Sequence, residues 1–341
     1  MTQQQIVREP PSFPGGPALR NIVSDNGEQW LAFRKTLEPR YWIAWAQIAL
    51  SYVMLIAGVV ASSWIGIRWG MTIGLITAPL FAVWIGYWLH PLMLFGHEAA
   101  HFHLASKRST NDFLTNLFVM SPLGLDVKLY RKIHWQHHLH LGDPHDTEIS
   151  YHDQPSFKFL IQAFTGVYPI KKLIEYYAAL GRANTSSTGA DTDGEHKKRW
   201  FFAMARTALI HLAVLGGLAA FGHFGAALAW GMGLVVFFPA FNMVRQILEH
   251  RAIDADAHAD FTQVEHGAVN RMFPSGPVSS TFGGAGFNKH LLHHWDPGVS
   301  YTCFPEMESF LAKTNVAPTV DAARTTYYEA LRSLMTDADV R

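Results

Sequence analysis

Cysteine is nearly absent from this chain, which has Cys303 alone among 341 residues. A single cysteine excludes an intramolecular disulfide framework, a zinc ribbon and a cysteine-ligated iron–sulfur or rubredoxin site within the chain. Any electrons that its chemistry requires must therefore come from another molecule.

Charged side chains are also scarce, at 16% of the residues, whereas soluble domains carry about a quarter. Lys+Arg and Asp+Glu balance at 27 each, so no basic excess indicates a nucleic-acid partner. Histidine, by contrast, is abundant, with 19 residues. The composition therefore favours a membrane protein with many potential metal ligands.

Long apolar runs occur at 41–61, 71–95, 200–222 and 224–244. Three of them lack Asp, Glu, Lys and Arg, and the run at 200–222 contains only Arg206, near its start. Each run reaches the roughly 20 residues that a helix needs to cross the hydrocarbon core. Buried helices of a large soluble fold are the alternative, which the length of the runs and their lack of charge disfavour. We therefore predict an all-α integral membrane protein with four transmembrane helices.

The four spans pair as two hairpins, with connections at 62–70 and around His223 on one face of the membrane. Of the 27 Lys and Arg residues, only Arg68 falls on that face. Because cytoplasmic loops carry the excess of Lys and Arg, this distribution places both termini and the segment 96–199 in the cytoplasm.

Nine histidines fall into four short clusters, at 97–101 (HEAAH), 134–138 (HWQHH), 246–250 (QILEH) and 290–294 (HLLHH). Side chains three and four residues apart share one face of a helix, so the histidines within each cluster should converge. The predicted topology brings all four clusters to the cytoplasmic side, in a helical cap. The candidate metal ligands are His97, His101, His134, His137, His138, His250, His290, His293 and His294.

Nine imidazoles are too many for one metal ion, so we expect two ions with four or five nitrogens each. Imidazole suits iron, zinc, copper and nickel; redox-inert zinc would serve hydrolysis, whereas iron would serve oxidation. The HEAAH cluster alone is typical of a zinc hydrolase. A zinc hydrolase site of this type needs only one ligand beyond the HEAAH cluster. The seven histidines of the other clusters exceed that need, so they disfavour a zinc hydrolase.

The other histidines are expected to have packing or surface roles, except that His145, close to the second box, is kept as a further candidate. His103 follows His101 by two residues and should point away from the site on a continuing helix. Two or three of the acidic residues near the clusters are expected to orient ligand imidazoles through hydrogen bonds, and the others are expected to be solvated surface charges. The acidic candidates are Glu98, Asp112, Asp126, Asp143, Asp146, Glu148, Glu249 and Asp296.

From the first span to about Leu311, the chain resembles the membrane fatty acid desaturase and hydroxylase superfamily. The family pattern is HxxxH, HxxHH and a later HxxHH among four spanning helices, and the chain has these boxes in that order. The resemblance implies a di-iron centre, O2 as co-substrate and an acyl or alkyl substrate that enters from the bilayer. Many acyl desaturases place a water-linked Asn four residues before the additional histidine, where this chain has Gln246.

The resemblance implies oxidation of an unactivated C–H bond in a fatty acyl or other lipid-like chain, with desaturation as the leading hypothesis. Hydroxylation by the same site is the close alternative, since Glu249 and His250 are also similar to the alkane hydroxylase branch. An intramembrane zinc hydrolase and a histidine-lined metal transporter are the more distant alternatives. No cytochrome b5-like His-Pro-Gly-Gly motif is present, so a separate ferredoxin, rubredoxin or cytochrome with its reductase is expected as electron donor.

The expected organisation is a polar N-terminal segment at 1–40, a membrane catalytic domain at 41–311 and a C-terminal cytoplasmic segment at 312–341.

Overall fold

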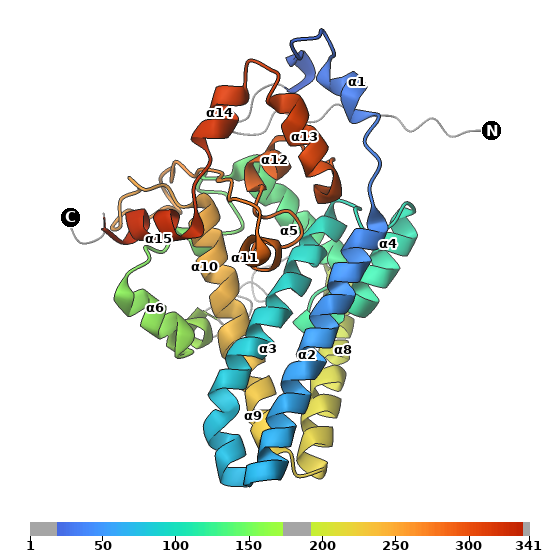
Figure 1. Ribbon diagram of the computed structural model, residues 1–341, viewed down its shortest axis with the longest axis vertical. Helices are drawn as coiled ribbons and strands as arrows, with labels where there is room; N and C mark the ends of the chain where they lie inside the picture. The colour runs from blue at the N-terminus through green and yellow to red at the C-terminus, as the bar shows by residue number, and fades with distance from the viewer. Residues whose placement is uncertain (1–18, 173–191, 337–341) are drawn as a thin grey trace.

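In this computed structural model, which describes residues 19–172 and 192–336, long helices form one end of the molecule and short helices cap the other (Figure 1). The long elements are α2 (Tyr41–Trp69), α3 (Met71–Ala100), α8 (Thr192–Ala220), α9 (Phe224–Met232) and α10 (Phe238–His250). No β-strand occurs in the described ranges, which contain only isolated bridges. The predicted all-α fold is confirmed.

Four segments are long and apolar enough to cross a membrane: Tyr41–Trp69, Met71–Ala100, Gly194–Ala220 and Phe224–His250. The last of these joins α9 to α10 through a π-helical turn, Gly233–Phe237. The four predicted spans are therefore confirmed as helices, and each helix is longer than the apolar run that predicted it.

The connection expected at 62–70 is mostly helical, because α2 continues to Trp69 and only Gly70 separates it from α3. Gly70 has a φ of 90°, in the left-handed region that glycine adopts without steric cost. The second hairpin approaches the first at another glycine. A Cβ atom on Gly225 would lie 2.5 Å from the carbonyl oxygen of Gly74, so only glycine allows this contact between α9 and α3.

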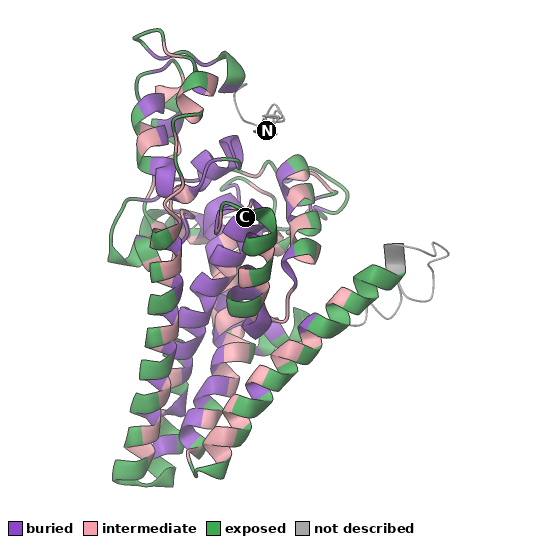
Figure 2. Cartoon of the chain, turned by 90° about the vertical axis from the view of Figure 1, so that its right-hand side faces the viewer, coloured by how far each residue is buried: buried purple, intermediate pink, exposed green. Residues whose placement is uncertain are grey.

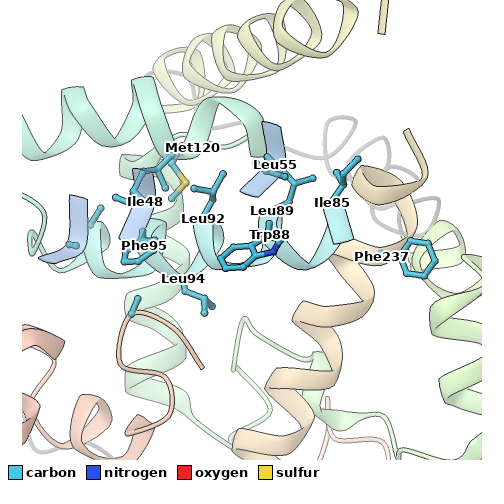
Figure 3. Close-up of a cluster of buried hydrophobic side chains, with 14 of the residues drawn as sticks. Ile48, Leu55, Ile85, Trp88, Leu89, Leu92, Leu94, Phe95, Met120 and Phe237 are labelled. Atoms are coloured by element: carbon cyan, nitrogen blue, oxygen red, sulfur yellow. The ribbon is translucent and has the colours of Figure 1, made fainter. Parts of the chain in front are cut away.

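Helix α3 lies at the centre of the membrane part, between α2 on one side and α9 and α10 on the other. Figure 3 shows its buried side chains, including Ile85, Leu89 and Leu92, packed with Leu55 of α2 and Phe237 of the π-helical turn. The outward faces are apolar and exposed, as expected for helices surrounded by lipid (Figure 2). This packing fixes the end of α3 relative to α10.

The cap consists of short helices that pack on the ends of α3 and α10 (Figure 1). These helices are α1 (Trp30–Arg34), α4 (Arg108–Thr115), α5 (Val127–His140), α6 (Phe157–Phe164), α11 (Pro277–Thr281), α12 (His290–Trp295), α13 (Phe304–Leu311), α14 (Ala317–Ala322) and α15 (Tyr327–Thr336). One buried apolar cluster joins α1 to α12 and α13, and another joins α6 and α15 to α10. Helix α5 packs against α3 and α4, and the first of these clusters holds α12 against α1 and α13.

Candidate metal centre

Four helices bring the predicted ligands to one place at the base of the cap. His97 lies in the last turn of α3, and His250 is the last residue of α10. Helix α5 starts at a cap formed by Asp126, whose carboxylate accepts hydrogen bonds from the next backbone N–H groups. Helix α5 carries the second box, and the six-residue helix α12 carries the last box. The two membrane helices therefore end where the two short helices present their histidines.

The nine histidines form two groups, in each of which the potential ligand atoms lie within 4.8 Å of one another. The five-histidine group consists of His97, His101, His134, His138 and His293. The four-histidine group consists of His137, His250, His290 and His294. All nine side chains are buried. The structure thus brings together every histidine that the sequence singled out, and both α5 and α12 contribute to both groups.

The Nε2 atoms of neighbouring rings converge within each group. The Nε2 atom of His138 lies 2.9 Å from that of His134 and 2.9 Å from that of His293. In the other group, the Nε2 atom of His290 lies 2.9 Å from that of His250 and 3.2 Å from that of His294. Two nitrogens bound to one ion at about 2.1 Å and at right angles would lie about 3.0 Å apart. The spacing therefore fits shared metal ions.

The hydrogen-bond inventory of the first box supports the same interpretation. Both ring nitrogens of His97 and of His101 are enclosed and lack a hydrogen-bond partner among the described residues. Buried polar atoms are nearly always satisfied in folded proteins, and each one left unpaired costs free energy. A metal ion bound to these rings would remove that cost, so the residues present fit the metal centre that the sequence predicts.

Burial keeps most of these imidazoles in the neutral form that binds metals. It lowers the pKa of His101, His138 and His290 well below 6.5, and neighbouring imidazoles lower it further. His137 differs, because the carboxylates of Glu148 and Asp146 outweigh its burial and raise its pKa. At neutral pH the rings with lowered pKa values keep a lone pair available for a metal.

Acceptors outside the two groups orient three of the rings. The Nδ1 atom of His134 donates to Glu148 and that of His137 donates to Asp146, each at 2.9 Å. The Nδ1 atom of His250 donates to the backbone carbonyl of Val269 at 3.1 Å. These hydrogen bonds fix the tautomer and direct Nε2 toward the centre of each group.

Glu98, Glu249 and Gln246 also lie beside the two groups. An oxygen of Glu98 lies 3.9 Å from the Nδ1 atoms of His97 and His293, and an oxygen of Glu249 lies 4.0 Å from the Nε2 atom of His290. Gln246 donates its amide hydrogen to Glu148. Gln246 therefore bonds the carboxylate that orients His134.

Asp296, in contrast, bonds no imidazole in the described ranges of the chain. Its carboxylate accepts hydrogen bonds from the Trp30 indole at 3.2 Å and pairs with Arg34 at 2.7 Å. These contacts attach α1 to the end of α12, so Asp296 holds the cap together.

The expectation that His103 points away from the site was wrong, because α3 ends at Ala100 and Phe102 has a φ of 66°. This left-handed residue turns His103 back, and its Nδ1 atom donates to Glu98 at 3.2 Å. The guanidinium of Arg131 stabilises the turn, since it covers the Phe102 ring and donates to the carbonyl oxygen of Ala100. No local pattern in the sequence predicts this turn, since a positive φ at phenylalanine is uncommon.

A cavity of about 360 Å³ opens beside the two groups. Its apolar lining comes from α3, α5, α10 and the segment before α12: Met93, Leu94, Ile133, Phe238, Pro239, Met243 and Phe287. Ligand candidates from both groups also line it, among them His97 and His290. The cavity therefore gives an apolar molecule access to the metal centre.

Comparison with known proteins identifies the family. A comparison with curated proteins gives no match. The family model described as fatty acid desaturase matches residues 74–322, which include all nine clustered histidines and the helices that carry them. The match confirms the resemblance that the histidine boxes predicted and implies an oxidoreductase that acts on lipids. The chain belongs to the fatty acid desaturase family.

Proposed function

We propose that the chain holds two irons and uses O2 to oxidise an unactivated C–H bond of a fatty acyl or other lipid-like chain. The observation that carries this proposal is the division of nine buried imidazoles into two adjacent groups. The groups are neighbours, since the rings of His138 and His294 are 4.6 Å apart although each belongs to a different group. Two adjacent all-nitrogen sites suit a pair of redox-active ions better than one hydrolytic zinc.

Such an iron pair would supply the capacity to use O2 as an oxidant. Within the five-histidine group, His97, His101, His134, His138 and His293 would hold one iron. Within the four-histidine group, His137, His250, His290 and His294 would hold the other. Glu148 and Asp146 would keep their imidazoles oriented, which conserves the site geometry while the oxidation state changes.

The chain's other contribution is the position of the substrate. Leu94, Phe238 and Phe287 line the cavity beside the ligands, so an apolar chain would displace water from it. A methylene group held against the site would be presented for oxidation without competing solvent. Small changes in that position decide which product forms.

Desaturation is the leading proposal, and hydroxylation remains the alternative. In desaturation, a –CH2–CH2– unit, O2, two electrons and two protons give –CH=CH– and two waters. In hydroxylation, a C–H group with the same reactants gives an alcohol and one water. Both reactions need an electron donor, which we propose is a separate ferredoxin, rubredoxin or cytochrome with its reductase. We also propose that the metal centre faces the cytoplasm, on the basis of the Lys and Arg distribution.

Product analysis tests the proposal. The full chain, reconstituted with a reductase and donor protein, would be incubated with lipid extracts and O2, and products would be analysed by mass spectrometry. Loss of two hydrogens supports desaturation, and gain of one oxygen supports hydroxylation. Turnover that continues at the same rate without O2 would instead indicate a hydrolase and refute the proposal.

A further inference from the structure

Arg206 lies in a helix long and apolar enough to cross a membrane, and two of its guanidinium nitrogens lack a partner within the described part of the chain. It belongs to α8, within the span Gly194–Ala220. Its Nε and Nη2 atoms are enclosed and have no hydrogen-bond partner among the described residues. An arginine stays charged in proteins, and an unpaired buried charge is costly. An anionic group at this position would remove that cost.

The Arg206 guanidinium lines a groove of about 440 Å³ where α8 faces α4 and the start of α5. Lys128 and Arg199 also line the groove, and Asp112 is the one carboxylate among the described residues that line it. Two of these groups have partners: Asp112 pairs with Arg131 at 2.6 Å, and Arg199 pairs with Glu195 at 2.6 Å. The three lining cations exceed the one lining carboxylate by two, so the groove is electropositive.

The groove also has an apolar wall that faces the surroundings of the membrane helices. Phe113 is 66% exposed and Leu117 is 48% exposed, and both line the groove. Helix α8 is the most exposed of the four candidate spans, with 11% of its apolar window buried, and its ribbon is mostly green and pink, for exposed and intermediate residues, in Figure 2. Lipid would therefore surround this part of the protein.

The depth of Arg206 fits the boundary between the acyl chains and the headgroups. It lies 14 residues before Ala220, the end of α8 at the hairpin turn, which corresponds to about 21 Å of helix. A hydrocarbon core is about 30 Å thick, so the backbone of Arg206 lies inside the core. The long arginine side chain reaches toward the headgroup layer on the side of the cap.

We propose that this groove binds the phosphate of an anionic phospholipid, with its acyl chains against Phe113 and Leu117. The Nε and Nη2 atoms of Arg206 form the edge of the guanidinium that binds two phosphate oxygens at once. Lys128 adds a second cation at the mouth of the groove. Basic pockets between membrane helices recognise anionic headgroups in this way. The site shares no residue with either histidine group, so the inference is independent of the proposed reaction.

The test measures lipid retention by the full-length protein with its metals in place. Wild-type protein in nanodiscs of equal phosphatidylglycerol and phosphatidylcholine would be released into detergent and analysed by native mass spectrometry. The variants are Arg206→Gln and Lys128→Gln, with Lys158→Gln as the matched control, because Lys158 is exposed on α6 and outside the groove. Metal content would be measured on each sample to show that the fold is retained.

We expect wild-type protein and Lys158→Gln to retain phosphatidylglycerol in preference to phosphatidylcholine. In each groove variant, the preference for phosphatidylglycerol should be about five-fold lower than in wild type. This factor corresponds to about 1 kcal/mol for each basic side chain near an anionic surface. Equal retention of the two lipids by the wild type, or an unchanged preference in Lys128→Gln, would overturn the proposal. Displacement of the lipid by millimolar inorganic phosphate would also overturn it, since it would show a phosphate site without a role for the acyl chains. If Arg206→Gln fails to fold, Lys128→Gln carries the test.

Discussion

Replacement of Asp146 by alanine should weaken metal binding in the four-histidine group alone. The buried Asp146 carboxylate accepts hydrogen bonds from the Nδ1 atom of His137 at 2.9 Å and from the Tyr151 hydroxyl at 2.6 Å. No other histidine of the two groups donates a hydrogen bond to it among the described residues. Asp146 also accepts a hydrogen bond at 2.9 Å from the backbone N–H of Glu148, but the ligand ring that it bonds directly is that of His137, in the four-histidine group.

The expected size of the effect follows from these contacts. Loss of a hydrogen bond that orients a ligand imidazole typically lowers metal affinity about 10- to 100-fold. The variant also leaves a buried imidazole N–H and a buried hydroxyl without their acceptor, at about 1–3 kcal/mol each. We therefore expect Asp146→Ala to be less stable by about 2–6 kcal/mol in free energy of unfolding and to release one of two metals more readily than wild type.

Competition with a chelator measures this difference. Wild type and variant, purified anaerobically, would be titrated with chelator while released and retained metal are quantified. Asp143→Ala is the control, because the Asp143 side chain is 41% exposed in the same turn and bonds the backbone of His145. Chelator resistance of Asp146→Ala equal to wild type, or equal losses in both variants, would refute the assigned role of Asp146.

Three further predictions test the site and the fold. His138→Ala should lower bound metal and abolish turnover while membrane insertion is unchanged, since its Nε2 atom lies 2.9 Å from two other ring nitrogens; full activity would remove the second box from the site. Gly225→Ala should lower the melting temperature of the detergent-solubilised protein, because its Cβ atom would lie 2.5 Å from a backbone oxygen of α3, at a cost of about 1–3 kcal/mol. The control Gly231→Ala should leave the melting temperature unchanged, because a Cβ atom on Gly231 would meet open space. Burial and the Arg251 guanidinium lower the pKa of His266 to about 3, so the folded state favours the neutral ring. The stability that the neutral His266 ring contributes is therefore complete above the unfolded pKa of about 6.5 and is lost as the pH falls toward 3. The melting temperature of His266→Asn should therefore fall less than that of wild type between pH 6.5 and 4, and parallel curves would contradict this assignment.

Much of the fold could be predicted from the sequence because local patterns dictate it. The uncharged apolar runs predict the spans through the thickness of the bilayer alone. The spacing of His134, His137 and His138 predicts that the three rings lie on one side of α5. These features depend on residues that are close in sequence, so periodicity and hydropathy are sufficient to find them.

The division of the histidines into two groups could not be predicted in the same way. His137 and His138 are adjacent in sequence but belong to different groups: His138 lies with the histidines at the end of α3, and His137 lies with His250 at the end of α10. The contact of His103 with Glu98 depends on a backbone turn at Phe102 that Arg131 stabilises from another helix. Long-range packing determines both features, and no local signal in the sequence reports it.

The partners of the acidic residues were also beyond prediction from sequence. Asp146 and Asp296 both lie close to a histidine box, yet Asp146 bonds a ligand imidazole and Asp296 bonds Trp30 and Arg34. Proximity in sequence could not distinguish these roles, because the indole and guanidinium come from a segment more than 250 residues away.

The metal content of anaerobically purified protein is the most direct test of the central claim. The two groups of buried histidines predict about two irons per chain, measured by inductively coupled plasma mass spectrometry against protein concentration from amino-acid analysis. A single zinc per chain with no iron would contradict the di-iron assignment and the oxidation chemistry that depends on it.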